Sequence, residues 1–238
     1  MAEAASRIFC AIDTDDADAA LALARRVGGS VGGLKLGLEF FLAHGPAAVR
    51  QVADERPLFL DLKLHDIPNT VAGGVRAVTP LRPAFLTLHA AGGAEMMRRA
   101  AAAATETADR LGVPRPKLLG VTVLTSLEAD DLAQLGQAGA VADQVRRLAT
   151  LAQECGLDGV VASPQEVAML RATCGPDLTL VIPGVRPTWA AADDQKRVMT
   201  PAEAVAAGAD YLVIGRPITR ADDPAAAAAR IAAEIEAG

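Results

Sequence analysis

The sequence predicts an α/β protein, a single (β/α)8 TIM barrel spanning residues 1–238 as one domain. Three observations predict it. Eight short apolar runs recur along the chain, helix-like segments separate them, and no linker rich in proline, glycine or serine interrupts the series. Eight strand–helix units in a chain of this length are typical of a closed barrel of parallel strands.

The eight runs are the predicted strands. They are mostly continuous in apolar character rather than alternating, which is typical of strands covered on both faces. In chain order they are residues 8–13, 32–37, 57–63, 84–90, 117–125, 157–163, 178–185 and 210–217.

The intervening segments carry helix signals. "SPQEVAMLRATC" begins with Ser163 as an N-cap, and Glu166 follows three residues later, as in a capping box. "TPAEAVAAGA" repeats the pattern with Thr200 and Glu203. Stretches such as "RRAAAAATETADR" are rich in alanine, which has the highest helix propensity.

A doubly wound open sheet is the alternative fold. It would need fewer strands and usually places a glycine-rich turn after the first strand. Here the first run continues as "AIDTDDADAA", which contains no glycine. The barrel is therefore the better prediction.

Composition excludes several classes of function. The chain is 51% hydrophobic and 22% charged with a net charge of −6, so nucleic-acid binding has little electrostatic support. No run approaches the roughly 20 apolar residues that span a bilayer, and the N-terminus lacks a signal-peptide pattern, so we expect a cytoplasmic protein without membrane contact. The three cysteines are far apart and predict reduced, buried thiols. Only 3% of residues are aromatic, which predicts an aliphatic core.

Charged residues gather where the predicted strands end. In barrels of this kind the active site lies at the carboxyl ends of the strands. The polar and charged candidates at these ends are Asp13, Lys35, Asp61, Lys63, His89, Thr125, Ser126, Arg186 and Arg216.

The stretch "DLKLHD" places acid, base and acid within six residues of one strand end. Asp61 and Lys63 are two residues apart, so they project from one face of the strand, and Lys35 lies on the neighbouring strand. Asp66 follows in the turn. At about 4 Å and an effective dielectric constant near 20, each opposite pair contributes roughly 4 kcal/mol before desolvation. A purely structural ion-pair network is the alternative, although buried pairs are often no more stabilising than apolar packing.

"DLKLHDIPNT" resembles the D-x-K-x-x-D signature of the orotidine 5′-phosphate decarboxylases, here extended through Ile67, Pro68, Asn69 and Thr70. The resemblance covers the whole chain. It includes "AIDTDD", "GLKLGLEFF", "LTLHAAGG", "GVTVLTS", "VIPGVRP" and "DYLVIGRPIT", which follow the order of the barrel strands.

The resemblance implies conversion of orotidine 5′-monophosphate to uridine 5′-monophosphate and CO2, the last step of UMP biosynthesis, without a metal or organic cofactor. Lys63 would deliver a proton to C6 of the pyrimidine, and Asp61 would lie beside the departing carboxylate. Asp66 and Thr70 would reach the active site of the partner subunit, which implies a homodimer.

The resemblance also assigns the rest of the substrate site. Asp13 and Lys35 would contact the ribose hydroxyls, and Thr125 and Ser126 the pyrimidine edge. Gly215 and Arg216 would bind the phosphate. Pro183, Arg186 and Gln195 belong to the long polar connection 183–199, which we expect to act as a lid over the ligand.

Two alternatives stay open. A related 3-keto-gulonate 6-phosphate decarboxylase or aldolase-type enzyme would hold Mg2+ with help from an acidic residue on the second strand, where this chain has Lys35. Persistence of activity in a chelator would argue against that class. A catalytically silent phosphate-binding or scaffolding barrel is the other alternative, although it gives no reason to keep four charges together.

Overall fold

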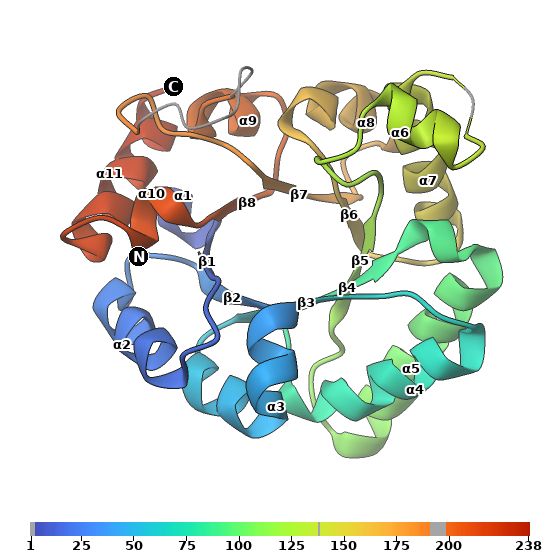
Figure 1. The fold of residues 1–238 in the computed structure, drawn as a ribbon, viewed down its shortest axis with the longest axis horizontal. Helices are drawn as coiled ribbons and strands as arrows, with labels where there is room; N and C mark the ends of the chain where they lie inside the picture. The colour runs from blue at the N-terminus through green and yellow to red at the C-terminus, as the bar shows by residue number, and fades with distance from the viewer. Residues whose placement is uncertain (1–2, 138, 191–198) are drawn as a thin grey trace.

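The predicted barrel is present in the computed structural model, which describes residues 3–137, 139–190 and 199–238. Eight parallel strands form one closed sheet in the order β1-β2-β3-β4-β5-β6-β7-β8. Figure 1 looks down the barrel and shows helices surrounding the strands on all sides. Parallel strands need a crossover between neighbours, and each crossover here returns along the outside of the barrel.

Every predicted run contains a strand, and several strands end earlier than their runs. The bounds are β1 Ile8–Ile12, β2 Gly33–Gly37, β3 Leu58–Leu64, β4 Phe85–His89, β5 Lys117–Val121, β6 Gly159–Val161, β7 Thr179–Pro183 and β8 Tyr211–Ile214. The apolar residues beyond β5 and β7 lie in loops that line the mouth of the barrel. Apolar character alone does not distinguish these loops from strand because they too face a partly enclosed space.

The helices mostly alternate with the strands, and β5 and β8 are each followed by two α-helices. The α-helices are α1 Glu3–Ser6, α2 Ala17–Val27, α3 Leu38–Ala53, α4 Pro68–Val78, α5 Ala94–Leu111, α6 Ala129–Gln134, α7 Val141–Glu154, α8 Val167–Cys174, α9 Pro201–Ala206, α10 Arg216–Thr219 and α11 Pro224–Ala237. Within the described residues, the short 3-10 helices are η1 Thr79–Leu81, η2 Ala90–Gly92 and η3 Pro164–Glu166.

The capping boxes predicted at two helix starts are both present. Glu203 N donates to Thr200 Oγ1 at 3.2 Å, and Thr200 N donates to Glu203 Oε2 at 2.8 Å. The hydrogen bond from the Thr200 backbone lowers the pKa of Glu203. At η3, Ser163 N donates to Glu166 Oε2 at 2.8 Å, while burial raises the pKa of Glu166. These local contacts satisfy amides that the helix itself leaves free.

The prediction of an aliphatic core is correct for only one of the two parts of the core. Between the barrel and its helices the packing is almost entirely aliphatic. Inside the barrel, Phe9, Phe59, Phe85 and Tyr211 pack edge to face, with ring centroids 5.0 to 6.0 Å apart. The few aromatic residues are concentrated there because large rings fill the interior of a narrow barrel.

Two arginine–aspartate pairs link neighbouring strands at the amino-terminal end of the barrel. Arg171 donates to Asp210 Oδ2 at 2.7 Å, and the same oxygen accepts from the backbone N of Leu180 in β7. Arg115 and Asp158 repeat the arrangement just before β6. There Asp158 Oδ2 accepts from the backbone N of Leu118 in β5 at 2.7 Å. This end of the barrel is therefore held together by hydrogen bonds remote from the predicted active site.

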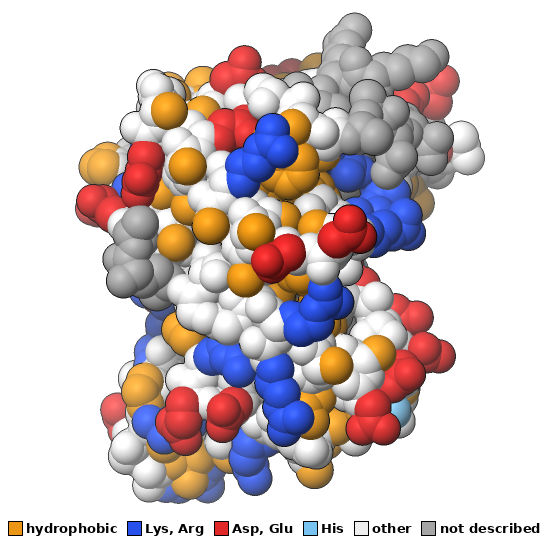
Figure 2. Space-filling view, turned by 90° about the vertical axis from the view of Figure 1, so that its left-hand side faces the viewer, with side chains coloured by type: hydrophobic (Ala, Val, Ile, Leu, Met, Phe, Trp, Pro, Cys, Tyr) orange, Lys and Arg blue, Asp and Glu red, His pale blue; other side chains and the backbone are white. Residues whose placement is uncertain are grey.

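The surface carries charges of both signs. On the face turned to the viewer in Figure 2, acidic and basic side chains are interspersed among apolar and uncharged atoms. Among the helices that the structure describes, none combines the length and the apolar character needed to cross a membrane.

Candidate active site

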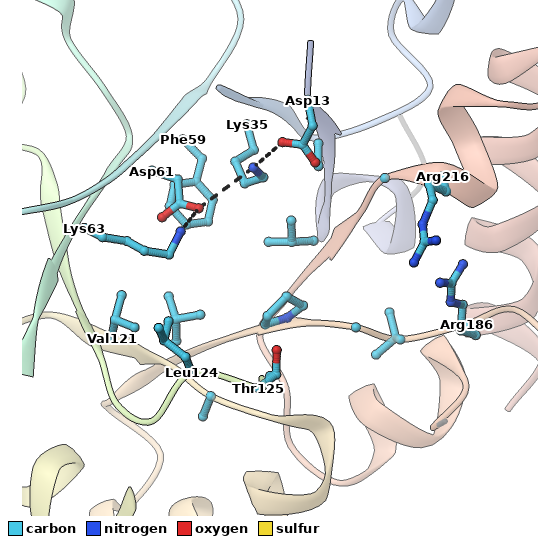
Figure 3. A pocket seen from close by; sticks show the side chains of 18 of the residues that line it. Asp13, Lys35, Phe59, Asp61, Lys63, Val121, Leu124, Thr125, Arg186 and Arg216 are labelled. Atoms are coloured by element: carbon cyan, nitrogen blue, oxygen red, sulfur yellow. Dashed lines mark hydrogen bonds and ion pairs between the residues drawn. The ribbon is translucent and has the colours of Figure 1, made fainter. Parts of the chain in front are cut away.

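A pocket of about 350 Å³ opens at the carboxyl ends of the strands. Figure 3 shows it from close by. Its lining includes most of the predicted substrate residues, namely Asp13, Lys35, Asp61, Lys63, Thr125, Pro183, Arg186, Gly215 and Arg216. The ring of Phe59 also belongs to the lining, so the aromatic interior of the barrel forms the base of the pocket. The structure brings this set of residues together around one pocket, and their roles remain a prediction.

Four charged side chains form a chain of alternating sign along one side of the pocket (Figure 3). Lys35 Nζ lies 2.9 Å from Asp13 Oδ1 and 3.8 Å from Asp61 Oδ2. Lys63 Nζ donates to the same Asp61 oxygen at 2.7 Å. Asp61 Oδ2 therefore serves both ammonium groups, and the two carboxylates balance the two lysines.

Among these four charged side chains, burial increases from the rim of the pocket toward the middle of the series. The Asp13 side chain is 63% exposed, whereas those of Lys35 and Asp61 are 11% and 13% exposed. Lys63 is intermediate at 31%, so its ammonium is partly open to the pocket. Charges removed from water to this extent need partners close by. The geometry provides them and leaves Lys63 accessible to a ligand.

Thr87 contributes a contact that the sequence analysis did not single out. This residue of β4 is fully buried, and its Oγ1 donates to Asp61 Oδ1 at 2.8 Å. The available signal was one polar residue in the middle of the apolar run "FLTLH". Whether that residue faced the barrel interior or the helices depended on the strand register.

Two histidines lie beside this cluster. The rings of His65 and His89 are 5.3 Å apart between centroids. Burial lowers the pKa of His89, and the nearby His65 and Lys63 lower it further. His89 is therefore more readily kept neutral than an ordinary histidine, in agreement with a supporting rather than a charged role.

Two arginines lie at the opposite side of the pocket. Figure 3 shows the guanidinium groups of Arg186 and Arg216 facing one another at this side, away from Lys63. Arg216 follows β8 directly, after Gly215, and Arg186 follows β7. Two converging guanidinium groups are suited to binding one anion with several oxygens, such as a phosphate. Gln195, predicted for the same region, lies outside the described residues.

Apolar side chains form the wall between the two charged ends. Val121 at the end of β5 and Leu124 in the following loop line the pocket next to Thr125 (Figure 3). Only the hydroxyl residues of this loop, Thr125 and Ser126, were predicted from the sequence to contact the ligand. Apolar lining with a few polar groups is typical of a site that binds a flat organic ring.

A second group of predicted residues does not line the pocket of its own chain. Asp66, Ile67, Pro68, Asn69, Thr70 and Ser126 are absent from the lining, and all but Pro68 are exposed. Asp66 Oδ1 accepts from the backbone N of Ile67, the next residue, at 2.7 Å, just before α4. The sequence analysis grouped Asp66 with Lys35, Asp61 and Lys63, whereas within one chain the fourth member of the charged cluster is Asp13.

Comparison with known proteins agrees with this geometry. A family model described as "Orotidine 5'-phosphate decarboxylase / HUMPS family" matches residues 6–231. The chain is 57% identical to an orotidine 5'-phosphate decarboxylase of Paramagnetospirillum magneticum, covering 96% of this chain and 97% of that protein. It is 59% identical to the enzyme of the same name from Rhodospirillum rubrum, over 96% of this chain and 93% of that one.

A solved structure shows the same likeness in three dimensions. The crystal structure of orotidine 5'-phosphate decarboxylase from Lactobacillus acidophilus superposes with a TM-score of 0.85 at 36% identity, covering 96% of this chain and 98% of that one. The likeness thus extends over the whole barrel and not only over the charged motif. The chain belongs to the orotidine 5'-phosphate decarboxylase / HUMPS family.

Proposed function

We propose that this enzyme decarboxylates orotidine 5′-monophosphate to uridine 5′-monophosphate, the last step of UMP biosynthesis, with Lys63 as the proton donor. Family membership and full-length relatives named for this reaction support the activity. The observation that carries the role of Lys63 is its ammonium, 2.7 Å from Asp61 and partly open to the pocket.

The reaction needs a group that stabilises charge at one carbon atom. As the bond between C6 and the carboxylate breaks, its electron pair stays on C6 and CO2 leaves. An ammonium facing C6 attracts this developing negative charge and then transfers its proton, which forms the new C–H bond. Lys63 becomes a neutral amine and regains a proton from solvent before the next cycle.

Asp61 has two roles in this proposal. Its carboxylate pairs with the ammonium groups of both neighbouring lysines and so holds them at this side of the pocket. The same negative charge would lie beside the substrate carboxylate. That repulsion would be relieved as CO2 departs, so it would raise the energy of the bound substrate more than that of the transition state.

The remaining contacts orient the nucleotide. With the two arginines at one side of the pocket and Lys63 at the other, a phosphate would bind at Arg186 and Arg216 and the pyrimidine near Lys63, with Asp13 and Lys35 placed for the ribose hydroxyls (Figure 3). Thr125 would bind the pyrimidine edge against the apolar wall. Binding energy from a phosphate far from the reacting carbon can then hold the ring in its reactive position.

Asp66 and Thr70 are proposed to complete the site of a second copy of the chain. The segment that contains them is exposed, and Ile67 within it is 67% exposed. Leu38 and Leu42, which follow the adjacent strand β2, are 44% and 77% exposed. Large apolar side chains exposed next to a polar functional segment are typical of a protein–protein interface. These features support a homodimer with shared active sites.

The decisive assay follows the loss of orotidine 5′-monophosphate by ultraviolet absorbance. Lys63→Ala should lower kcat by at least about 10³-fold while the variant stays folded and still binds uridine 5′-monophosphate. Activity of the unaltered protein should persist in EDTA, whereas a Mg2+-dependent relative would lose it. Near-normal turnover of Lys63→Ala would contradict the assigned role.

The same variant tests the shared site. Lys63→Ala and Asp66→Asn chains, coexpressed with different tags, should form mixed dimers in which one of two sites is intact. A statistical mixture should regain about a quarter of the normal activity. The control is each variant expressed alone. Purified mixed dimers without activity would show that Asp66 serves its own chain.

A further inference from the structure

Lys63 has a backbone conformation that is unusual for its place in the fold. Its φ is +49°, within β3, where L-residues ordinarily have negative φ. The other described non-glycine residues with positive φ, Asp54 and Arg82, are C-caps of helices, where this conformation is common. A left-handed lysine inside a strand is costly and persists only where its surroundings hold it.

The strand register shows what holds it. Leu60 pairs with Leu86 and Leu64 with Leu88, so three residues of β3 are opposite the single residue Thr87 of β4. Because of this β-bulge, the backbone N–H of Lys63 has no regular backbone hydrogen-bond partner on β4. Lys63 N donates instead to the hydroxyl of Thr87 at 2.9 Å.

The same hydroxyl orients the carboxylate. Thr87 Oγ1 accepts from Lys63 N and donates its own proton to Asp61 Oδ1 at 2.8 Å. With Oδ1 held in this way, Oδ2 is turned toward both ammonium groups. One buried hydroxyl therefore connects the backbone of the lysine to the carboxylate that pairs with its side chain.

We propose that Thr87 is a positioning residue for catalysis, which fixes the left-handed backbone of Lys63 and the orientation of Asp61 through its single hydroxyl. It does not line the pocket, so it acts through these two residues and not on the substrate. The inference rests on the proposed role of Lys63 as proton donor. A shift of that ammonium by about 1 Å is enough to lower a rate about 10²-fold.

The test compares four side chains at this position. Thr87→Val keeps the shape and removes the hydroxyl, Thr87→Cys offers only a weak donor, and Thr87→Ser keeps the hydroxyl. We expect kcat to fall about 10- to 100-fold in the valine and cysteine variants and to recover to within about threefold in the serine variant. KM and the Kd for uridine 5′-monophosphate should change by less than about threefold, because phosphate and ribose contacts remain.

Thr79→Val is the matched control. Thr79 is equally buried and donates to the carbonyl of Val75 at 2.7 Å, but it lies outside the pocket. This variant should lose stability without a change in kcat per folded molecule. The comparison separates the general effect of losing a buried hydroxyl from the specific effect of losing the hydroxyl of Thr87.

The outcomes distinguish the two proposals. Normal kcat in the valine and cysteine variants would overturn the role of Thr87, as would a serine variant as slow as valine, which would indicate packing by the methyl group. If the valine variant does not fold, the comparison of serine with cysteine decides. Lys63→Ala, assayed alongside, tests the proton donor independently of these results.

Discussion

Asp61→Asn should destabilise the protein although it removes only one charge and leaves the shape of the side chain unchanged. Asp61 Oδ2 lies 2.7 Å from Lys63 Nζ and 3.8 Å from Lys35 Nζ. At an effective dielectric constant near 20, these distances correspond to gross attractions of about 6 and about 4 kcal/mol. An asparagine NH2 would instead present a third donor to two ammonium groups.

The net effect is smaller than this sum because the carboxylate is also costly to bury. Removing one partner of a buried ion pair typically destabilises a protein by about 3–5 kcal/mol. Lys63 remains 31% exposed, so water can partly solvate its ammonium in the variant. We therefore expect a loss of about 3 kcal/mol, which for a chain of this length lowers Tm by roughly 6–12 °C.

Thermal and urea unfolding at one fixed protein concentration would measure this loss, because association also contributes to the stability of an oligomer. Asp143→Asn is the control. Its carboxylate is 2.8 Å from Arg146, but both side chains are about half exposed, and such surface pairs contribute about 1 kcal/mol or less. An Asp61→Asn protein as stable as the original, or more stable, would refute the conclusion that this carboxylate holds the two lysines.

Two further variants test stability at other places. His89 has a lowered pKa, so its contribution to stability is complete above about pH 6.5 and is lost as the pH falls below that value; His89→Asn should therefore flatten the decline of Tm between about pH 7 and pH 5. The exposed His44→Asn variant is its control, and an unchanged slope in His89→Asn would contradict the reasoning. Arg171 donates to Asp210 and to the carbonyl of Gly208, so Arg171→Ala should lower the free energy of unfolding by about 2–3 kcal/mol in urea. Its kcat per folded molecule should not change, since these contacts lie at the other end of the barrel; a slower folded enzyme would show that this end influences the site.

Local sequence patterns determined much of the fold and the position of the site. Apolar runs separated by capped helices predicted the eight strands, and the capping boxes at Ser163 and Thr200 formed as expected. Those features depend on residues within a few positions of one another. The gathering of charge at the carboxyl ends of the strands follows from the closed parallel topology, so it too was predictable once the strands were assigned.

The sequence could not determine how distant strands meet. The register between β3 and β4 places Thr87 opposite the bulge that contains Lys63, and the pairing of β1 with β2 brings Asp13 to Lys35. Which aromatic side chains lie inside the barrel is likewise visible only in the folded structure. The spacing of residues along one strand does not say which of its two faces points inward. Short-range spacing and propensity can be read from the sequence, whereas these contacts join residues more than 20 positions apart and form only when neighbouring strands pair in this register.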